Sequence, residues 1–165
     1  MQNLARTFAL AFVSLSIALA LPSPATADKG GHVMLAPGDV KWGDAPPILP
    51  AGAKLAVLYG DPGKDGLYVL RLKLPAGYKI AAHFHPVDEN VTVLSGSFAM
   101  GMGDKLDAAK TKAFPAGSFL VMPGKMNHFA LAKGETTVEV TGMGPFTLTY
   151  VNPDDDPTRQ QAARK

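Results

Sequence analysis

The stretch HFHPVDENVTVLSG, at residues 83–96, combines two histidines one residue apart, an acidic pair and an apolar run that ends at a glycine. Along a β-strand the side chains at i and i+2 point to the same face, whereas on a helix they diverge. An extended backbone therefore projects His83 and His85 to one side. Pro86 then interrupts regular pairing, and Glu89 precedes the strand-like run NVTVL. Past that bend the Glu89 carboxylate can return to the face that carries the histidines, so the stretch predicts part of a metal site on a strand.

A third histidine lies in a later unit with the same turn-then-strand character, GSFLVMPGKMNHFAL at residues 117–131. By itself His128 is better explained as a partly buried structural histidine. Beside the His83–His85 pair and Glu89 the ligand interpretation gains weight. Two such units can bring their side chains together when their strands are neighbours in a sheet.

The rest of the sequence from residue 54 onward favours an all-β fold. In the run at residues 66–74 apolar and basic residues alternate with the period of a half-buried strand: Tyr68, Leu70, Leu72 and Leu74 against Arg71 and Lys73. Similar short runs occur at 54–59, 78–84, 90–94, 97–102, 118–122, 127–132, 136–141 and 146–151. Glycine and proline separate them, which is typical of a β-sandwich or barrel. Only residues 104–112 have a helical composition, enough for a turn or two.

These two units resemble the sequence motifs of the cupin family. The first cupin motif has the form G-x5-H-x-H-x3,4-E-x6-G, and every defined position is filled, by Gly77, His83, His85, Glu89 and Gly96. The second has the form G-x5-P-x-G-x2-H-x3-N, and Gly117, Pro123 and His128 fit it. Lys125 stands where the motif has glycine and Ala132 where it has asparagine, departures that concern the geometry of the turn. The resemblance covers about residues 54–151.

The resemblance implies a jelly-roll β-barrel with a metal ion inside, coordinated by His83, His85, Glu89 and His128. Three imidazoles and one carboxylate suit Mn, Fe, Co, Ni, Cu or Zn. Glu89 is also the candidate catalytic residue, as a base that shifts off the metal. Its neighbour Asp88 is interpreted as a solvent-facing turn residue.

Two further groups of residues have simpler explanations than metal binding. Five methionines, Met100, Met102, Met122, Met126 and Met143, could supply thioether ligands for Cu(I), but methionine filling a barrel core is the commoner case. The fourth histidine, His32, lies in a loose N-terminal segment, where a surface position is the simplest interpretation and capping of the barrel mouth the alternative.

The N-terminus has the pattern of a secretory signal peptide. Arg6 precedes an uncharged apolar run at residues 8–21, and the small-x-small sequence of residues 25–27 follows two prolines. The run is shorter than the roughly 20 apolar residues of a membrane span. We therefore expect cleavage after Ala27 and a secreted or periplasmic protein. The alternatives are an uncleaved membrane anchor and cleavage at residues 18–20.

The expected organisation is a signal peptide at 1–27, an irregular segment at 28–53 that packs on the barrel, a cupin domain at 54–151 and a flexible polar tail at 152–165. In the segment 28–53 the expected docking points are Val33, Leu35 and Trp42. The chain has no cysteine, so an exported form has no disulfides and a metal site has N and O ligands.

Composition excludes some partners and leaves the activity open. A formal net charge of +2 gives no reason to expect binding to nucleic acid or to an anionic membrane. The expected partners are a small organic ligand or substrate and, as one assembly, a second copy in a homodimer. Three functions stay open: an oxygenase, isomerase or lyase, a non-catalytic binding or sensing module, and a structural barrel with a vestigial site. An enzyme often has an additional Arg or Tyr over the metal, for which Tyr68 and Tyr78 are candidates, whereas Arg71 is expected to face outward.

Overall fold

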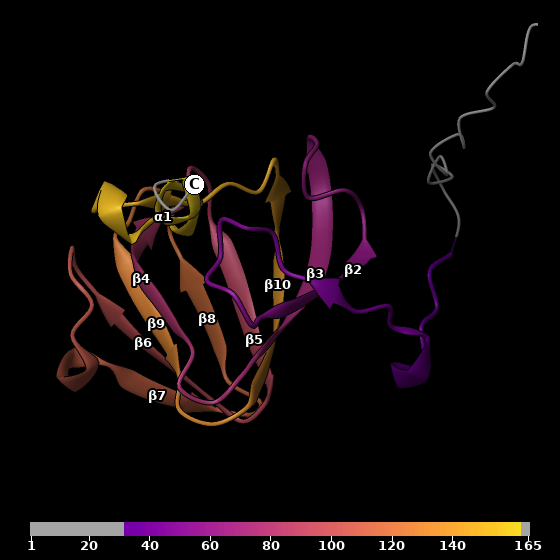
Figure 1. The fold of residues 1–165 in the computed structure, drawn as a ribbon. Coiled ribbons are helices and arrows are strands. Elements are labelled where there is room, and N and C mark those ends of the chain that lie inside the picture. The colour runs from indigo at the N-terminus through magenta and orange to yellow at the C-terminus, as the bar shows by residue number, and fades with distance from the viewer. Residues whose placement is uncertain (1–31, 163–165) are drawn as a thin grey trace, which may run out of the picture.

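The computed structural model describes residues 32–162, in which two antiparallel β-sheets face each other to form a jelly-roll barrel (Figure 1). The six-stranded sheet has the order β1 (Gly43–Asp44), β2 (Lys54–Tyr59), β3 (Gly66–Leu74), β10 (Thr136–Gly144), β5 (Glu89–Ser95) and β8 (Phe119–Met122). The five-stranded sheet has the order β11 (Thr149–Tyr150), β4 (Lys79–Phe84), β9 (His128–Ala132), β6 (Ser97–Met102) and β7 (Lys112–Pro115). The predicted all-β jelly roll is confirmed.

The core lies between the two sheets because their strands alternate as the sequence pattern indicates. On β3 the four apolar residues of the alternating run are all buried, while Arg71 lies on the outer face and its Nε donates to Glu139 Oε2 at 2.9 Å. The inner faces of β5 and β10 add valines, and those of β6 and β9 add Phe98, Met100 and two alanines. Strands β1 and β7 are additions to the predicted set, and the predicted run at 146–151 contains only the short strand β11.

The N-terminal segment docks differently from the expectation. Val33 and Leu35 were expected to be buried and are 53% and 46% exposed, so that prediction was wrong. Trp42 is half-buried, with the Lys73 ammonium 4.3 Å from the centre of its ring. Of the described residues of the segment, Leu49 and Ala53 are those buried in the main core.

Two tyrosine hydroxyls hold the chain around Leu49 against the barrel. The Tyr78 hydroxyl donates to the Pro50 carbonyl, and the Tyr150 hydroxyl donates to the Ile48 carbonyl at 2.8 Å. These two hydrogen bonds anchor the segment through its backbone carbonyls. No side-chain pattern within the segment predicts them.

The remaining helices are short and peripheral. They are the 3-10 helices η1 (Pro37–Asp39), η2 (Ala108–Lys110) and η3 (Pro153–Asp155) and the α-helix α1 (Pro157–Ala162), none of which buries a residue. Helix η2 is the helical turn expected near 104–112, while η3 and α1 lie in the polar tail. Across residues 32–162 no helix has the length and apolar character needed to cross a membrane. The expected signal peptide lies outside the described residues.

Two motif glycines turn the chain at the ends of the strands that carry the site. Gly77 and Gly96 have φ of +78° and +76°, a conformation that side-chain-bearing residues rarely adopt. A Cβ on Gly77 would meet no atom within 4 Å, whereas a Cβ on Gly96 would overlap the Glu135 carbonyl oxygen and approach Thr136. Gly96 therefore serves two needs, the turn from β5 to β6 and close contact with the start of β10.

This difference predicts unequal costs for the same substitution. Gly77→Ala should lower the free energy of unfolding by about 1 kcal/mol, the cost of a left-handed backbone at one residue. Gly96→Ala should lower it by about 3 kcal/mol, because overpacking adds to the same backbone cost. Urea unfolding followed by circular dichroism measures both. Equal losses would show that the contact with the start of β10 relaxes without cost.

Candidate metal centre

Neighbouring strands of the five-stranded sheet bring the three motif histidines together. His83 on β4 lies opposite His128 on β9 in the strand register, and their ring centres are 4.3 Å apart. His85 follows β4 directly, with its ring 5.1 Å from that of His83 and 5.4 Å from that of His128. One ring nitrogen from each lies within 4.8 Å of the other two, and all three side chains are buried. These residues could therefore hold a metal ion.

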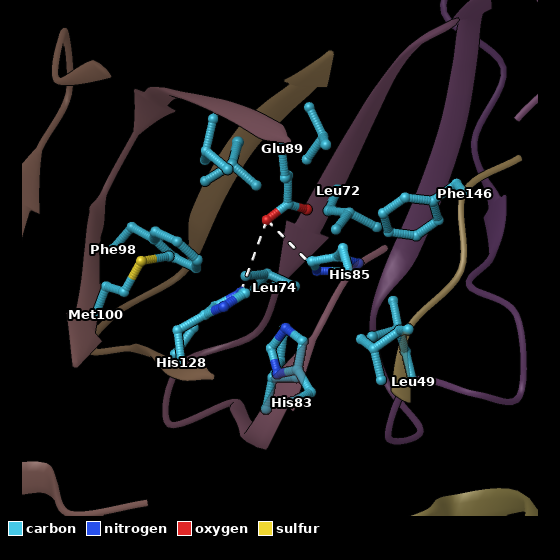
Figure 2. Close-up of a pocket in the computed structure, with 16 residues that line it drawn as sticks. Leu49, Leu72, Leu74, His83, His85, Glu89, Phe98, Met100, His128 and Phe146 are labelled. Carbon is cyan, nitrogen blue, oxygen red and sulfur yellow. Dashed lines mark ion pairs between the residues drawn. The ribbon is translucent and has the colours of Figure 1, made fainter. Parts of the chain in front are cut away.

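Glu89 approaches the same point from the opposite sheet. It is the first residue of β5, and its Oε2 lies 3.6 Å from His85 Nε2 and 3.9 Å from His128 Nε2 (Figure 2). Its side chain is 11% exposed, so the carboxylate is almost removed from water. The structure thus brings together all four residues that the sequence singled out, with the histidines on one sheet and the carboxylate on the other.

Backbone carbonyls determine which imidazole nitrogen faces the centre. His83 Nδ1 lies 2.7 Å from the Ala81 oxygen, His85 Nδ1 lies 2.7 Å from the Thr147 oxygen, and His128 Nδ1 lies 2.8 Å from the Met126 oxygen. A carbonyl can only accept a hydrogen bond, so each Nδ1 carries the proton and donates it. Each Nε2 is then left with a lone pair. This is the tautomer and the kind of backbone partner that metal-binding histidines have.

The Nε2 atoms point into a small and largely apolar cavity between the two sheets (Figure 2). The cavity has a volume of about 30 Å³, and aliphatic side chains, Phe98, Met100 and Phe146 make up most of its lining. His85 Nε2 and His128 Nε2 are buried without a hydrogen-bond partner. Buried nitrogens in proteins are seldom left unpaired, so two orphaned acceptors aimed at one point fit a metal ion as the missing partner.

Removal from water controls the protonation of the four side chains in the metal-free protein. Burial lowers the pKa of all three histidines below 6.5, and the pKa of His83 falls to about 3, with the neighbouring His128 adding to the shift. Burial raises the pKa of Glu89 from 4.5 to about 7, against the opposing effect of His128. At neutral pH the imidazoles are therefore neutral, which is the form that binds metals.

The two motif loops are hydrogen-bonded to each other beside the site. Asp88 is exposed as expected, but its carboxylate also accepts a hydrogen bond from Gly124 N–H at 2.8 Å, so it is more than a solvent-facing turn residue. Lys125 N–H donates to the His85 carbonyl at 2.7 Å. Lys125 has φ of +65°, so it adopts the conformation that the cupin glycine at this position would have. The turn geometry is kept despite the departure from the motif.

Four residues at or next to the site come from segments that the motifs do not mark. Phe146 stacks on His85 with ring centres 5.2 Å apart, and the next residue, Thr147, accepts the His85 proton. Leu49 from the N-terminal segment lines the cavity. Tyr68 makes an edge contact with Phe146 at 5.6 Å. Tyr68, a candidate from the sequence, thus lies behind Phe146 and does not line the cavity, and the missing side chain of Gly142 leaves room for its hydroxyl.

Other candidates lie elsewhere. Tyr78 is held by its contact with the N-terminal segment, and Arg71 faces outward as expected. His32 is exposed at the start of the described residues. The segment between β10 and β11, with Phe146 and Thr147, is part of the site, although the sequence marked residues 146–151 only as a strand-like run.

Solved structures that share this fold include an RmlC-like cupin. The polyketide cyclase RemF from Streptomyces resistomycificus aligns with a TM-score of 0.60 and 18% identity over 78% of this chain and 92% of its own. An RmlC-like cupin from Shewanella frigidimarina aligns with a TM-score of 0.53 and 17% identity over 68% of this chain and 91% of its own. KdgF from Halomonas sp. aligns with a TM-score of 0.51 and 18% identity over 67% of this chain and 93% of its own.

The fold and the two motifs thus define a cupin, as the resemblance implied. Within that class the chain belongs to the family described as a domain of unknown function, DUF4437, whose model matches residues 19–149. No curated protein matches the chain in sequence.

The buried histidines predict how the stability of the metal-free protein depends on pH. A histidine with a lowered native pKa contributes stability that is present above 6.5 and is lost as pH falls, by up to roughly 1.4 kcal/mol per pH unit. Glu89, with its raised pKa, acts in the opposite direction, and its contribution is lost as pH rises through about 7. Three histidines outweigh one carboxyl between about pH 5 and 6.5, so the free energy of unfolding of chelator-treated protein should fall with acidification across that window.

A matched pair of variants tests whether His83 contributes to this pH dependence of the unfolding free energy. His83→Gln removes one buried imidazole and should flatten the pH dependence measured by urea unfolding, whereas His32→Gln at an exposed position should leave it unchanged. An unchanged slope in His83→Gln would contradict a neutral buried histidine at this position.

Proposed function

We propose that this protein binds one divalent transition-metal ion through Nε2 of His83, His85 and His128, with Glu89 as the fourth ligand. The observation that carries the proposal is the orientation of the imidazoles, whose Nδ1 protons are engaged by carbonyls and whose Nε2 lone pairs converge inside a cavity. A neutral set of three imidazoles with one carboxylate suits Mn, Fe, Co, Ni, Cu or Zn. The position of the Glu89 carboxylate, within 4 Å of two of these nitrogens, supports its role as the fourth ligand.

We infer further that the metal centre acts on a small organic molecule. When bound, a divalent ion would supply a Lewis acid that polarises a substrate oxygen. The chain's own contribution is a dry cavity, a rigid set of imidazoles and one carboxylate. Glu89 is the ionisable group of the cavity able to exchange a proton with a substrate when its carboxylate shifts off the metal.

The place of action that we propose is outside the cytoplasm. Support comes from the sequence of residues 1–27, which has the basic start, the apolar run and the small-x-small pattern of an exported precursor. The absence of cysteine is compatible with that setting, because a metal site of N and O ligands does not depend on thiols staying reduced. N-terminal sequencing of the protein secreted from its native host tests this and should begin at residue 28.

The metal proposal predicts a stoichiometry and its loss. Elemental analysis of purified protein reconstituted with Mn²⁺, Co²⁺ or Zn²⁺ should give close to one ion per chain. A single His128→Ala substitution should weaken binding by more than about 100-fold, since even losing a partner outside the ligand set costs 10- to 100-fold. His32→Ala, at the one histidine outside the cluster, is the matched control and should bind normally.

Metal binding should also stabilise the native protein in proportion to ligand excess. At a metal concentration 100 times the dissociation constant, the gain in unfolding free energy should be about 2.7 kcal/mol. Thermal unfolding with and without metal measures it, and Glu89→Gln should retain part of the gain. Equal occupancy in the wild type and in His128→Ala would contradict the assignment of the ligands.

A further inference from the structure

An open groove lies on the flank of the barrel, outside the cavity of the candidate metal centre. It has a volume of about 530 Å³ and lies between the edge strand β8 of one sheet and strands β6 and β7 of the other. The turn at residues 116–118 joins β7 to β8. Its lining is mainly apolar, with three methionines, two phenylalanines and two lysines. A groove of this size is within the range of small-molecule sites.

Three methionines of the groove lie beside the candidate metal centre. Met122 on β8 lies opposite Glu89 in the strand register, and Met102 on β6 lies opposite His128. Met100 lines both the groove and the cavity at that centre. Figure 2 shows Met100 beside Phe98 on the same side of the cavity as His128. Two of the proposed ligands, Glu89 and His128, therefore have a groove-lining methionine as their cross-strand neighbour.

A substrate needs a route from the groove to the metal centre because the cavity at that centre is small. The cavity volume of about 30 Å³ is about a tenth of the roughly 300 Å³ at which small-molecule sites begin, so an organic molecule beside a metal ion needs the lining to move. Methionine is unbranched and has three rotatable bonds, so it changes shape at lower cost than the other core residues. The flank at which the barrel is lined by methionines is thus the one best able to open.

The charged and aromatic groups of the groove indicate what it would bind. The ionisable side chains that line it in the described part of the chain are two lysines, Lys110 and Lys112, with no acidic residue among them. Lys110 has an exposed partner, with Nζ 3.5 Å from Asp107 Oδ2, whereas Lys112 lies 5.4 Å over the Phe114 ring and has no acidic partner among residues 32–162. Phe119 presents an aromatic side chain that is 62% exposed. Aromatic rings and methionine sulfur pack well on a flat aromatic ligand.

We propose that this groove binds a planar aromatic carboxylate and passes it to the metal centre through the methionine wall formed by Met100, Met102 and Met122. The carboxylate lies near Lys112, and the ring lies against Phe114, Phe119 and the methionines. The passage to the metal rests on the proposed function, whereas binding in the groove does not depend on it.

The first test measures binding to metal-free protein with 1-naphthoate as the probe. Isothermal titration should show 1-naphthoate binding more tightly than 1-naphthylmethanol, which has the same ring system without the charge. Lys112→Gln should weaken 1-naphthoate binding by about fivefold, the upper range for an exposed ion pair. Lys79→Gln removes an equal charge outside the groove and should have no effect. Equal effects of the two substitutions, or equal affinity for acid and alcohol, would overturn the proposal.

The second test asks whether the probe reaches the metal. In Mn²⁺-loaded protein, 1-naphthoate that enters the cavity should displace water from the ion and lower the relaxation rate of water protons. Met100→Ile replaces the flexible side chain by a stiff β-branched one of similar size and should abolish that change while 1-naphthoate still binds. An unchanged response in Met100→Ile would rule out this route.

The two tests separate the possible failures. If 1-naphthoate binds but no metal does, the proposed function fails and the groove stands. If metal binds but 1-naphthoate does not, the groove assignment fails alone. A dimer detected by sedimentation that dissociates on Phe119→Glu and excludes 1-naphthoate would overturn the groove assignment in favour of an interface between two copies.

Discussion

The hydrogen bond from each buried histidine Nδ1 to a backbone carbonyl is the contact on which the candidate centre depends. It holds the ring in place and, because a carbonyl only accepts, directs the unprotonated Nε2 inward. Two of the three carbonyls, those of Ala81 and Met126, lie two residues before the histidine that they orient. The third, from Thr147, comes from the far end of the chain. The site is therefore built only when β11 and its approach segment have docked on β4.

Burial gives these contacts their chemical consequence. Removed from water, the imidazoles stay neutral and Glu89 favours its protonated form until a cation arrives. The same burial leaves a cavity of about 30 Å³, small enough to hold an ion and exclude bulk solvent. A cavity this small needs a route by which an organic molecule can enter. The methionines beside the open groove provide flexible side chains along such a route.

Much of this arrangement was predictable from local patterns. A period of two in a strand decides which side chains share a face, so the buried face of β3 and the shared side of His83 and His85 follow from the residues alone. The cupin motifs extend this to Glu89 and His128, because they encode which turns bring strands of opposite sheets together. Even the departure at Lys125 did not alter the turn, since its backbone adopts the left-handed conformation and donates to His85.

The sequence by itself determined the alternation of the strands, the glycine turns and the identity of the four clustered side chains. Tertiary structure decided everything that depends on contacts between distant segments. Leu49 lies in the core because Tyr78, just before β4, and Tyr150 on β11 bind the backbone beside it, while Val33 and Leu35 stay exposed. Phe146 and Thr147 orient His85 across a separation of about sixty residues, and the methionine wall exists only because β6 and β8 meet at the flank of the barrel. Strand periodicity is a local property of the backbone, but these contacts depend on which edges and loops pack together, and no local pattern encodes that choice.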